Sequence, residues 1–179
     1  MASRVMQLTI TVLGYTKNNF IDRILFGVNE CKCSILEMRA NRLMACTAAY
    51  FLINGEWNQI AKLENLLENL EKKLEIKIHL LRPGKFISHD DFTPYSLETV
   101  SLERQDALQS IIAFISDHDL TIEEISSSRY VDSYSQSELV TTRFILLVPA
   151  GIRILNLREE FLEFCDHINI DAILEPIKR

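Results

Sequence analysis

Residues 8–39, LTITVLGYTKNNFIDRILFGVNECKCSILEMR, decide the fold of this 179-residue chain. Apolar residues alternate with threonines over residues 8–12, which predicts a strand with one buried face. Over residues 20–31 the apolar residues recur at helical spacing, with polar residues left for solvent. A second strand is expected over residues 33–39. The stretch therefore predicts a strand, a loop, an amphipathic helix and another strand.

The loop in this stretch, Gly-Tyr-Thr-Lys-Asn-Asn at residues 14–19, is the first candidate functional site. It lies directly before a helix, whose first N–H groups lack partners within the helix and carry partial positive charge. Such a helix start suits a carboxylate or another small anion. Asn18 and Asn19 are also good helix caps, so capping alone is an alternative interpretation. Lys17 is either a ligand contact or an ordinary exposed lysine.

The composition excludes some classes of function. The net charge is −6, and no cluster of Lys and Arg supplies the basic face that unaided nucleic-acid binding requires. We expect no secretory signal, because no long apolar run follows the first residues, and no apolar run approaches the roughly 20 residues that a membrane span requires. Its four cysteines form no disulfide pattern. We therefore expect a cytoplasmic protein with reduced cysteines.

The next apolar segment, LMACTAAYFLI at residues 43–53, predicts a third strand that is apolar on both faces. Asn41 is expected in the connection before it, and Asn54 with Gly55 is expected to end it. If helices cover one face, the other face has to meet a second sheet or a partner subunit. This strand therefore predicts a homo-oligomer.

A helix from Trp57 to Leu74 and a strand over residues 76–80 complete the order βαββαβ, which is a ferredoxin-like unit. The segment 83–94 is rich in turn residues and is expected to be a linker. The predicted domains are residues 1–82 and residues 95–179.

The second half of the chain repeats the pattern of the first. Ile24 and Val28 correspond to Ile111 and Ile115 at a shift of 87 residues. After the second hairpin the shift becomes 95 residues, so that Ile53 corresponds to Val148 and Leu66 to Phe161; the extra residues are placed in the polar segment 130–138. The predicted fold is α+β, with two tandem ferredoxin-like βαββαβ domains.

A ferredoxin-like unit serves many functions, so each candidate function has to be argued from particular residues. An RNA-recognition module would need aromatic residues on its third strand and a basic segment, and the apolar strand and acidic composition disfavour both. Cys31, Cys33 and Cys46 do not supply the four ligands of a closed zinc site. The four histidines lie in no nucleophile or metal motif. These histidines are His79, His89, His118 and His167. We therefore expect no catalytic site, cofactor or metal.

Three motifs carry a resemblance to a known family. They are the first strand LTITVLG, the Cys-x-Cys-x-Ile segment that begins at Cys31, and the Gly-x-Trp-Asn segment that begins at Gly55. Together with the tandem repeat, they make the chain similar to tandem ACT domains and, within these, to the glycine cleavage system transcriptional repressor family. The resemblance implies a non-enzymatic repressor of glycine-cleavage genes. It also implies action through a LysR-type transcriptional activator, without direct DNA binding, and relief of repression by glycine.

The resemblance also points to a site for a small amino acid in the first copy. Family members usually carry Asp-Arg-Pro-Gly in the loop after the first strand, where this chain has Thr-Lys-Asn-Asn at residues 16–19. In the second copy the corresponding loop contains Glu103 and Asp106, which disfavour a carboxylate. An ACT-fold module that binds a partner protein without any ligand is the alternative function. The candidate ligand-binding residues are Gly14, Lys17, Asn18, Asn19, Phe20, Ile21, Ser34 and Ile35.

Overall fold

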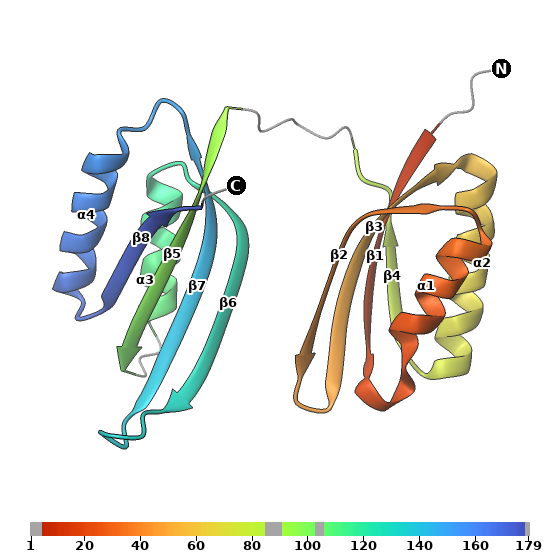
Figure 1. Cartoon of the computed structure of the whole chain (residues 1–179), viewed down its shortest axis with the longest axis horizontal. Helices are drawn as coiled ribbons and strands as arrows, with labels where there is room; N and C mark the ends of the chain where they lie inside the picture. Colours follow the sequence, from red (N-terminus) through yellow and green to blue (C-terminus); the bar gives the residue numbers. More distant parts are fainter. Residues whose placement is uncertain (1–4, 85–90, 103–105, 178–179) are drawn as a thin grey trace. The chain divides into compact units, whose positions relative to one another are not determined.

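The chain divides into two compact units, residues 1–87 and residues 88–179 (Figure 1). The computed structural model describes residues 5–84, 91–102 and 106–177 of them. Each unit has the order strand, helix, strand, strand, helix, strand. The predicted α+β fold with two tandem βαββαβ domains is therefore confirmed.

The first unit is a four-stranded antiparallel sheet in the order β2-β3-β1-β4, with both helices on one face (Figure 1). A short 3-10 turn (Thr16–Asn18) precedes its first helix. Its elements are β1 (Val5–Tyr15), α1 (Phe20–Glu30), β2 (Ser34–Leu43), β3 (Cys46–Glu56), α2 (Trp57–Leu74) and β4 (Lys77–Leu81).

The second unit has the same arrangement, with the strand order β6-β7-β5-β8 and both helices on one face (Figure 1). Its first strand begins at Phe92, within the segment 83–94 that was expected to be a linker. Residues 85–90 lie outside the described residues, so a linker there remains a prediction. The elements are β5 (Phe92–Leu102), α3 (Ala107–Asp117), β6 (Thr121–Val131), β7 (Glu138–Pro149), α4 (Ile154–His167) and β8 (Asp171–Pro176).

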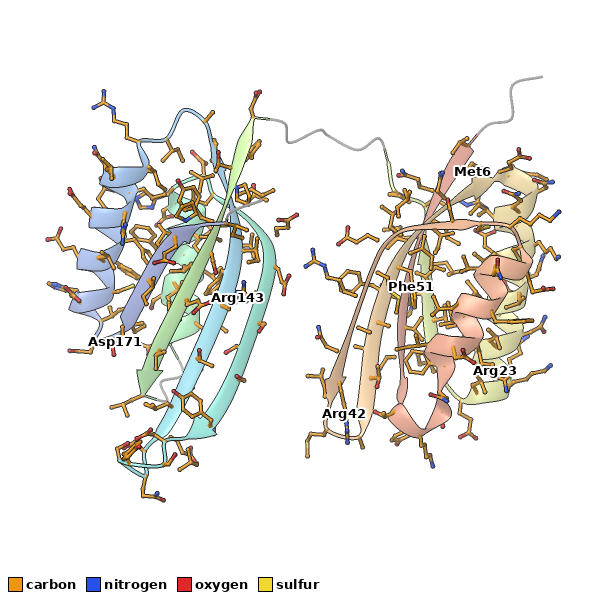
Figure 2. All side chains as sticks on the ribbon, in the orientation of Figure 1. Met6, Arg23, Arg42, Phe51, Arg143 and Asp171 are labelled. Carbon is orange, nitrogen blue, oxygen red and sulfur yellow. The ribbon has the colours of Figure 1, made fainter. Side chains whose placement is uncertain are left out.

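The core of each unit lies between its sheet and its two helices, where side chains fill the space (Figure 2). On β1 the alternate residues Leu8, Ile10 and Val12 are fully buried, as the sequence pattern predicts. In the second unit Leu97 and Phe144 lie opposite each other on β5 and β7 and are fully buried.

The third strand differs from the expected one at both ends. β2 continues to Leu43, so Asn41 lies within a strand rather than in a connection. β3 extends to Glu56, and Asn54 and Gly55 pair with residues of β1 instead of ending the strand. The turn falls at Met44, which takes a left-handed conformation with φ of 55°. Cross-strand pairing has overridden local turn preference here, since Asn and Gly are the usual turn residues.

Burial alternates along β3 despite its apolar sequence. Ala49, Phe51 and Ile53 are buried under the helices, whereas Tyr50 on the other face is 41% exposed. A cover over this second face, by a partner subunit or otherwise, therefore remains a prediction.

Matching β-bulges establish the internal repeat at the level of the backbone. The register of β2 shifts between Ile35 and Glu37, and the register of β6 shifts between Ile122 and Glu124, 87 residues later. Because β-bulges are specific local features, their agreement indicates that the two hairpins are equivalent.

The same register corrects the sequence alignment after the hairpin. Ile35 pairs with Ile53, and its counterpart Ile122 pairs with Leu146, so Ile53 corresponds to Leu146 and not to Val148. The sequence pattern could not detect this error, because a slip of two residues keeps every side chain on the same face.

A consequence is that the extra residues of the second copy fall in two places. Some lie in the tip between β6 and β7, as expected. One more lies between β7 and α4, since Ile53 and Leu146 are 93 positions apart whereas the equivalent residues Leu80 and Leu174 are 94 apart. The second unit has a loop there at residues 150–153, whereas α2 begins directly after β3. The placement of all extra residues in segment 130–138 was therefore wrong.

Candidate functional site

Gly14 is buried near the end of β1, and tight packing explains why it is a glycine. A Cβ atom added there would lie 2.5 Å from Ile76 Cγ2 and 3.2 Å from Phe20 Cδ1. Real Cβ atoms essentially never approach another atom to 2.5 Å, so a larger residue requires movement in the core. Gly14 thus lets the chain between α2 and β4 pack against the start of the candidate loop.

Internal hydrogen bonds hold the loop after Gly14 against β3 and the end of α2. The Asn18 side-chain amide donates to the Leu74 carbonyl at the end of α2, at 2.6 Å. The Thr16 N–H donates to the Ala45 carbonyl at 2.9 Å, and the Thr16 and Thr47 hydroxyls lie 3.0 Å apart. The Asn18 side chain therefore satisfies a free carbonyl of α2 and does not cap α1.

Asn19 occupies the position before α1 but does not cap it with its side chain. Its backbone is left-handed, with φ of 49°, a conformation that Asn tolerates better than most residues. Lys17 lies over the Tyr15 ring, with Nζ 5.7 Å from the ring centroid. Lys17 and Asn19 are exposed, so their side chains are accessible to a ligand, next to the first turn of α1 that holds Phe20 and Ile21.

Ser34 and Ile35 lie at the opposite end of the same sheet. Gly14 pairs with Thr47, near the end of the sheet that Arg42 marks in Figure 2. Ser34 pairs with Asn54, near the end that Met6 marks. At about 3.4 Å per residue, the two ends are roughly 24 Å apart. The first unit therefore does not bring Ser34 and Ile35 to the loop.

The order of strands and helices along the chain explains why Ser34 lies far from the loop. A helix between two parallel strands returns the chain to the end at which the first strand began, so β2 starts far from the loop that follows β1. Within this unit the Ser34 hydroxyl lies 3.4 Å from the Asn54 carbonyl, its acceptor on the adjacent strand.

In the second copy the loop equivalent to the one after β1 includes residues 103–105, which lie outside the described residues. Placing the ligand in the first copy therefore remains a prediction.

The cysteines of the first unit are not arranged as a metal site, because Cys31 and Cys33 follow α1 whereas Cys46 begins β3 at the other end of the sheet. Cys31 is buried directly after α1, and burial raises its pKa. Burial, followed by the charge of Cys31, raises the pKa of Cys33. Within residues 5–84, 91–102 and 106–177, no three His, Cys, Asp or Glu side chains are grouped so that they could hold a metal ion.

Sequence reasoning missed a cavity in the second unit. The sequence pattern places His118 in no motif, whereas the structure places His118 Nε2 3.1 Å from Glu160 Oε2 and His118 Nδ1 2.8 Å from the Phe114 carbonyl oxygen. His118 and Glu160 border a cavity of about 480 Å³ that Arg153 and Asn156 also line. The signal in the sequence was the Pro-Ala-Gly segment at residues 149–151, because proline and glycine disfavour a helix where α2 has its first turn.

The first unit resembles a known domain family. Residues 6–80 match the family model of the ACT domain. No curated protein matches the chain.

Two solved structures are similar over the whole chain. An unknown protein from Galdieria sulphuraria has a TM-score of 0.77 at 13% identity, covering 98% of this chain and 100% of that chain. A proposed glycine cleavage system transcriptional repressor has a TM-score of 0.77 at 18% identity, covering 99% of this chain and 100% of that chain. At these identities the likeness shows a shared fold.

No helix in the described part of the chain is long and apolar enough to cross a membrane.

Proposed function

We propose that this protein is a non-enzymatic, cytoplasmic regulator that represses glycine-cleavage genes by acting on a LysR-type transcriptional activator. The observation that carries the proposal is the likeness in fold, over nearly all of both chains, to a proposed glycine cleavage system transcriptional repressor. The match of residues 6–80 to the ACT domain family and the net charge of −6 support it, since an acidic protein is unsuited to unaided DNA binding.

A small amino acid such as glycine modulates this activity in the proposal. The loop after β1 offers the exposed Lys17 and Asn19 side chains beside the start of α1, where a carboxylate is stabilised. Binding there changes the affinity for the activator, and couplings between two sites are typically about 1–3 kcal/mol. Relief of repression by the amino acid then corresponds to a several-fold loss of affinity for the activator.

The gene-regulatory part is tested by fluorescence anisotropy with purified components. The chain alone is expected to leave glycine-cleavage promoter DNA unbound, and to change the binding of a LysR-type activator to that DNA. Added glycine is expected to reverse the change. Specific binding of DNA by the chain alone, or no effect on the activator, would contradict the proposal.

The ligand part is tested by calorimetry with glycine, alanine and serine on the full chain and two variants. Asn19→Asp keeps a residue that tolerates the left-handed backbone but places a negative charge beside the expected carboxylate. Binding at the loop is expected to weaken at least tenfold. The matched control is Asn29→Asp, which makes the same change at an exposed position near the other end of α1 and should bind normally.

A ligand-independent interaction module is the second candidate function. The observation that favours it is that Gly14 and Asn18, two of the expected ligand residues, are engaged in internal packing and hydrogen bonding. Unchanged affinity for the activator in the presence of every tested amino acid would select this alternative.

Homo-oligomerisation is part of the proposal and rests on the apolar sequence of β3. Size-exclusion chromatography with light scattering should give a mass at least twice that of one chain, which is 20.7 kDa. A monomer that persists at high concentration would contradict this part alone.

A further inference from the structure

The cavity in the second unit lies between the end of α3 and the start of α4. Its polar lining comes from His118 and Asp119 after α3, from Arg153 before α4, and from Asn156 and Glu160 on α4. Its volume, about 480 Å³, falls within the usual range for small-molecule sites, roughly 300–1,000 Å³. The cavity is at the end of the sheet where β5 begins, whereas the β5–α3 loop follows the other end.

The cavity exists because α4 begins late. In the first unit α2 starts directly after β3, and its first turn fills the corresponding corner. The packing there is close: a Cβ added to Gly55 would lie 3.0 Å from Cys33 Sγ and 3.3 Å from both Gln59 Oε1 and Ile60 Cδ1. In the second unit residues 150–153 form a loop in place of that turn. A loop that replaces packed structure is a common origin of binding sites.

The two helix starts also differ in how they are capped. The Glu56 carboxylate caps α2 in a capping box, in which the Glu56 N–H donates to Gln59 Oε1 at 2.7 Å. In the second unit the residue before the late start of α4 is Arg153, and its side chain does not cap α4. One copy thus supplies its own carboxylate at this corner, and the other presents a guanidinium, which binds carboxylates well.

The charges of the lining are separated along α4. Arg153 and Glu160 are seven residues apart, which places them on one face of the helix, about 10 Å apart along its axis. The Glu160 carboxylate accepts from His118 but remains accessible to solvent, and Asp119 adds a second carboxylate. A dianion would be repelled by this acidic side, whereas a molecule with one negative and one positive end is attracted at both.

We propose that this cavity binds a small dipolar molecule that carries one carboxylate and one ammonium group, such as a free amino acid. The carboxylate pairs with Arg153 near the start of α4, and the ammonium group faces Glu160 and Asp119. The inference rests on the proposed function for its ligand class, and it assigns that ligand to a site in the second unit that differs from the loop after β1.

The test is calorimetry and amide NMR on the full chain with glycine, alanine and serine, and with acetate and methylammonium as single-charge probes. The amino acids are expected to shift the amide signals of Ile152, Arg153 and Asn156. Acetate and methylammonium should each bind at least tenfold more weakly, since each satisfies only one end of the cavity.

Two pairs of variants make the test specific. Arg153→Ala removes the guanidinium and is expected to weaken binding at least tenfold, whereas Arg158→Ala removes an exposed arginine of α4 that does not line the cavity and should bind normally. Asn156→Glu adds a carboxylate in the cavity and should abolish binding. Its control, Leu155→Glu, adds the same charge to a neighbouring residue that is 71% exposed.

The outcomes separate this inference from the proposed function. Normal amino-acid binding to the Arg153→Ala variant, with signals shifted only near Lys17 and Asn19, would overturn the second site and leave the loop site supported. No shift at residues 152–157 with any amino acid would also overturn it. The effect of the chain on the activator–DNA complex is measured separately, so it decides the regulatory function in either case.

Discussion

Gly14 is the residue at which a single methyl group should have the largest effect on the candidate loop. Gly14→Ala is predicted to destabilise the protein by about 1–3 kcal/mol, because the new Cβ overlaps Ile76 Cγ2 in a closely packed core. Urea unfolding measures the change in free energy of unfolding. Gly84→Ala is the matched control, since an added Cβ meets no atom within 4 Å there, and it should be near neutral. Equal stability of the two variants would show that the core around Ile76 relaxes freely.

Cys165 should make the stability of the second unit depend on alkaline pH. Burial, followed by the charge of Asp166, raises the pKa of its thiol from 9.0 to about 12. Between these values the folded state keeps the thiol proton and the unfolded state releases it, so the contribution of this group falls as the pH rises. Cys165→Ala should therefore lose stability less steeply above pH 9. Urea unfolding at a series of pH values tests this, and parallel curves for both proteins would contradict it.

For single residues, the sequence identified the polar loop that precedes α1, but it did not predict which groups the side chains of this loop contact. The partner of Asn18 is the Leu74 carbonyl, 56 residues away in the chain. Only the packing of the end of α2 beside the loop creates that contact, and no local pattern encodes it. Capping preference correctly marked Asn18 as a hydrogen-bonding residue and assigned it to the wrong helix.

Among the elements, the hairpin tip between β6 and β7 is stabilised in part by one carboxylate. Asp132 Oδ2 accepts hydrogen bonds from the Ser135 N–H and from the Ser135 hydroxyl, both at 2.8 Å. These bonds, the backbone bond first, lower the pKa of Asp132 below 3.8. The stabilisation is present above pH 3.8 and is lost as the pH falls through the lowered value.

Ser135→Ala is therefore predicted to raise the pKa of Asp132 toward its ordinary value, because it removes one of the two bonds from that side chain. NMR titration of the Asp132 carboxyl measures the shift. Ser137→Ala alters a neighbouring serine at the same tip and should leave this pKa unchanged. A pKa of 3.8 or higher in the unmodified chain would contradict the assignment.

The helix pairs show how the two copies diverged. Gly27 allows close approach of α2, since a Cβ there would lie 2.7 Å from Leu66 Cδ2. The residue 87 positions later is Phe114, whose ring stacks on His118 at 4.0 Å and lies 5.1 Å from the Phe161 ring. The close contact at Gly27 in the first unit is thus replaced by an aromatic cluster around Phe114 in the second. This cluster includes His118, which borders the cavity.

Hydrophobic periodicity predicted the helices and strands of the first unit, and the internal repeat extended them to the second, although β2 and β6 contain no buried residue. It could not predict register, since a two-residue slip leaves the buried face of β7 unchanged. That slip hid the late start of α4, and with it the cavity. The fold was therefore readable from the sequence, whereas the second candidate site depended on a pairing that only the structure reveals.

For the molecule as a whole, each core cluster draws its residues from one unit, so the two units are expected to lose stability separately. Phe51 and Phe144 are both fully buried, on the equivalent strands β3 and β7. Replacing either one with Ala should cost about 3–5 kcal/mol in its own unit.

The single tryptophan, Trp57, belongs to the first unit, so its fluorescence reports that unit while circular dichroism reports both. In urea unfolding of the full chain, Phe51→Ala should move the fluorescence transition to lower urea and leave a second dichroism transition in place. Phe144→Ala should leave the fluorescence transition unchanged and shift part of the dichroism change. If either substitution moves both signals together, the units unfold as one cooperative body, and a ligand bound in one unit would then stabilise the other as well.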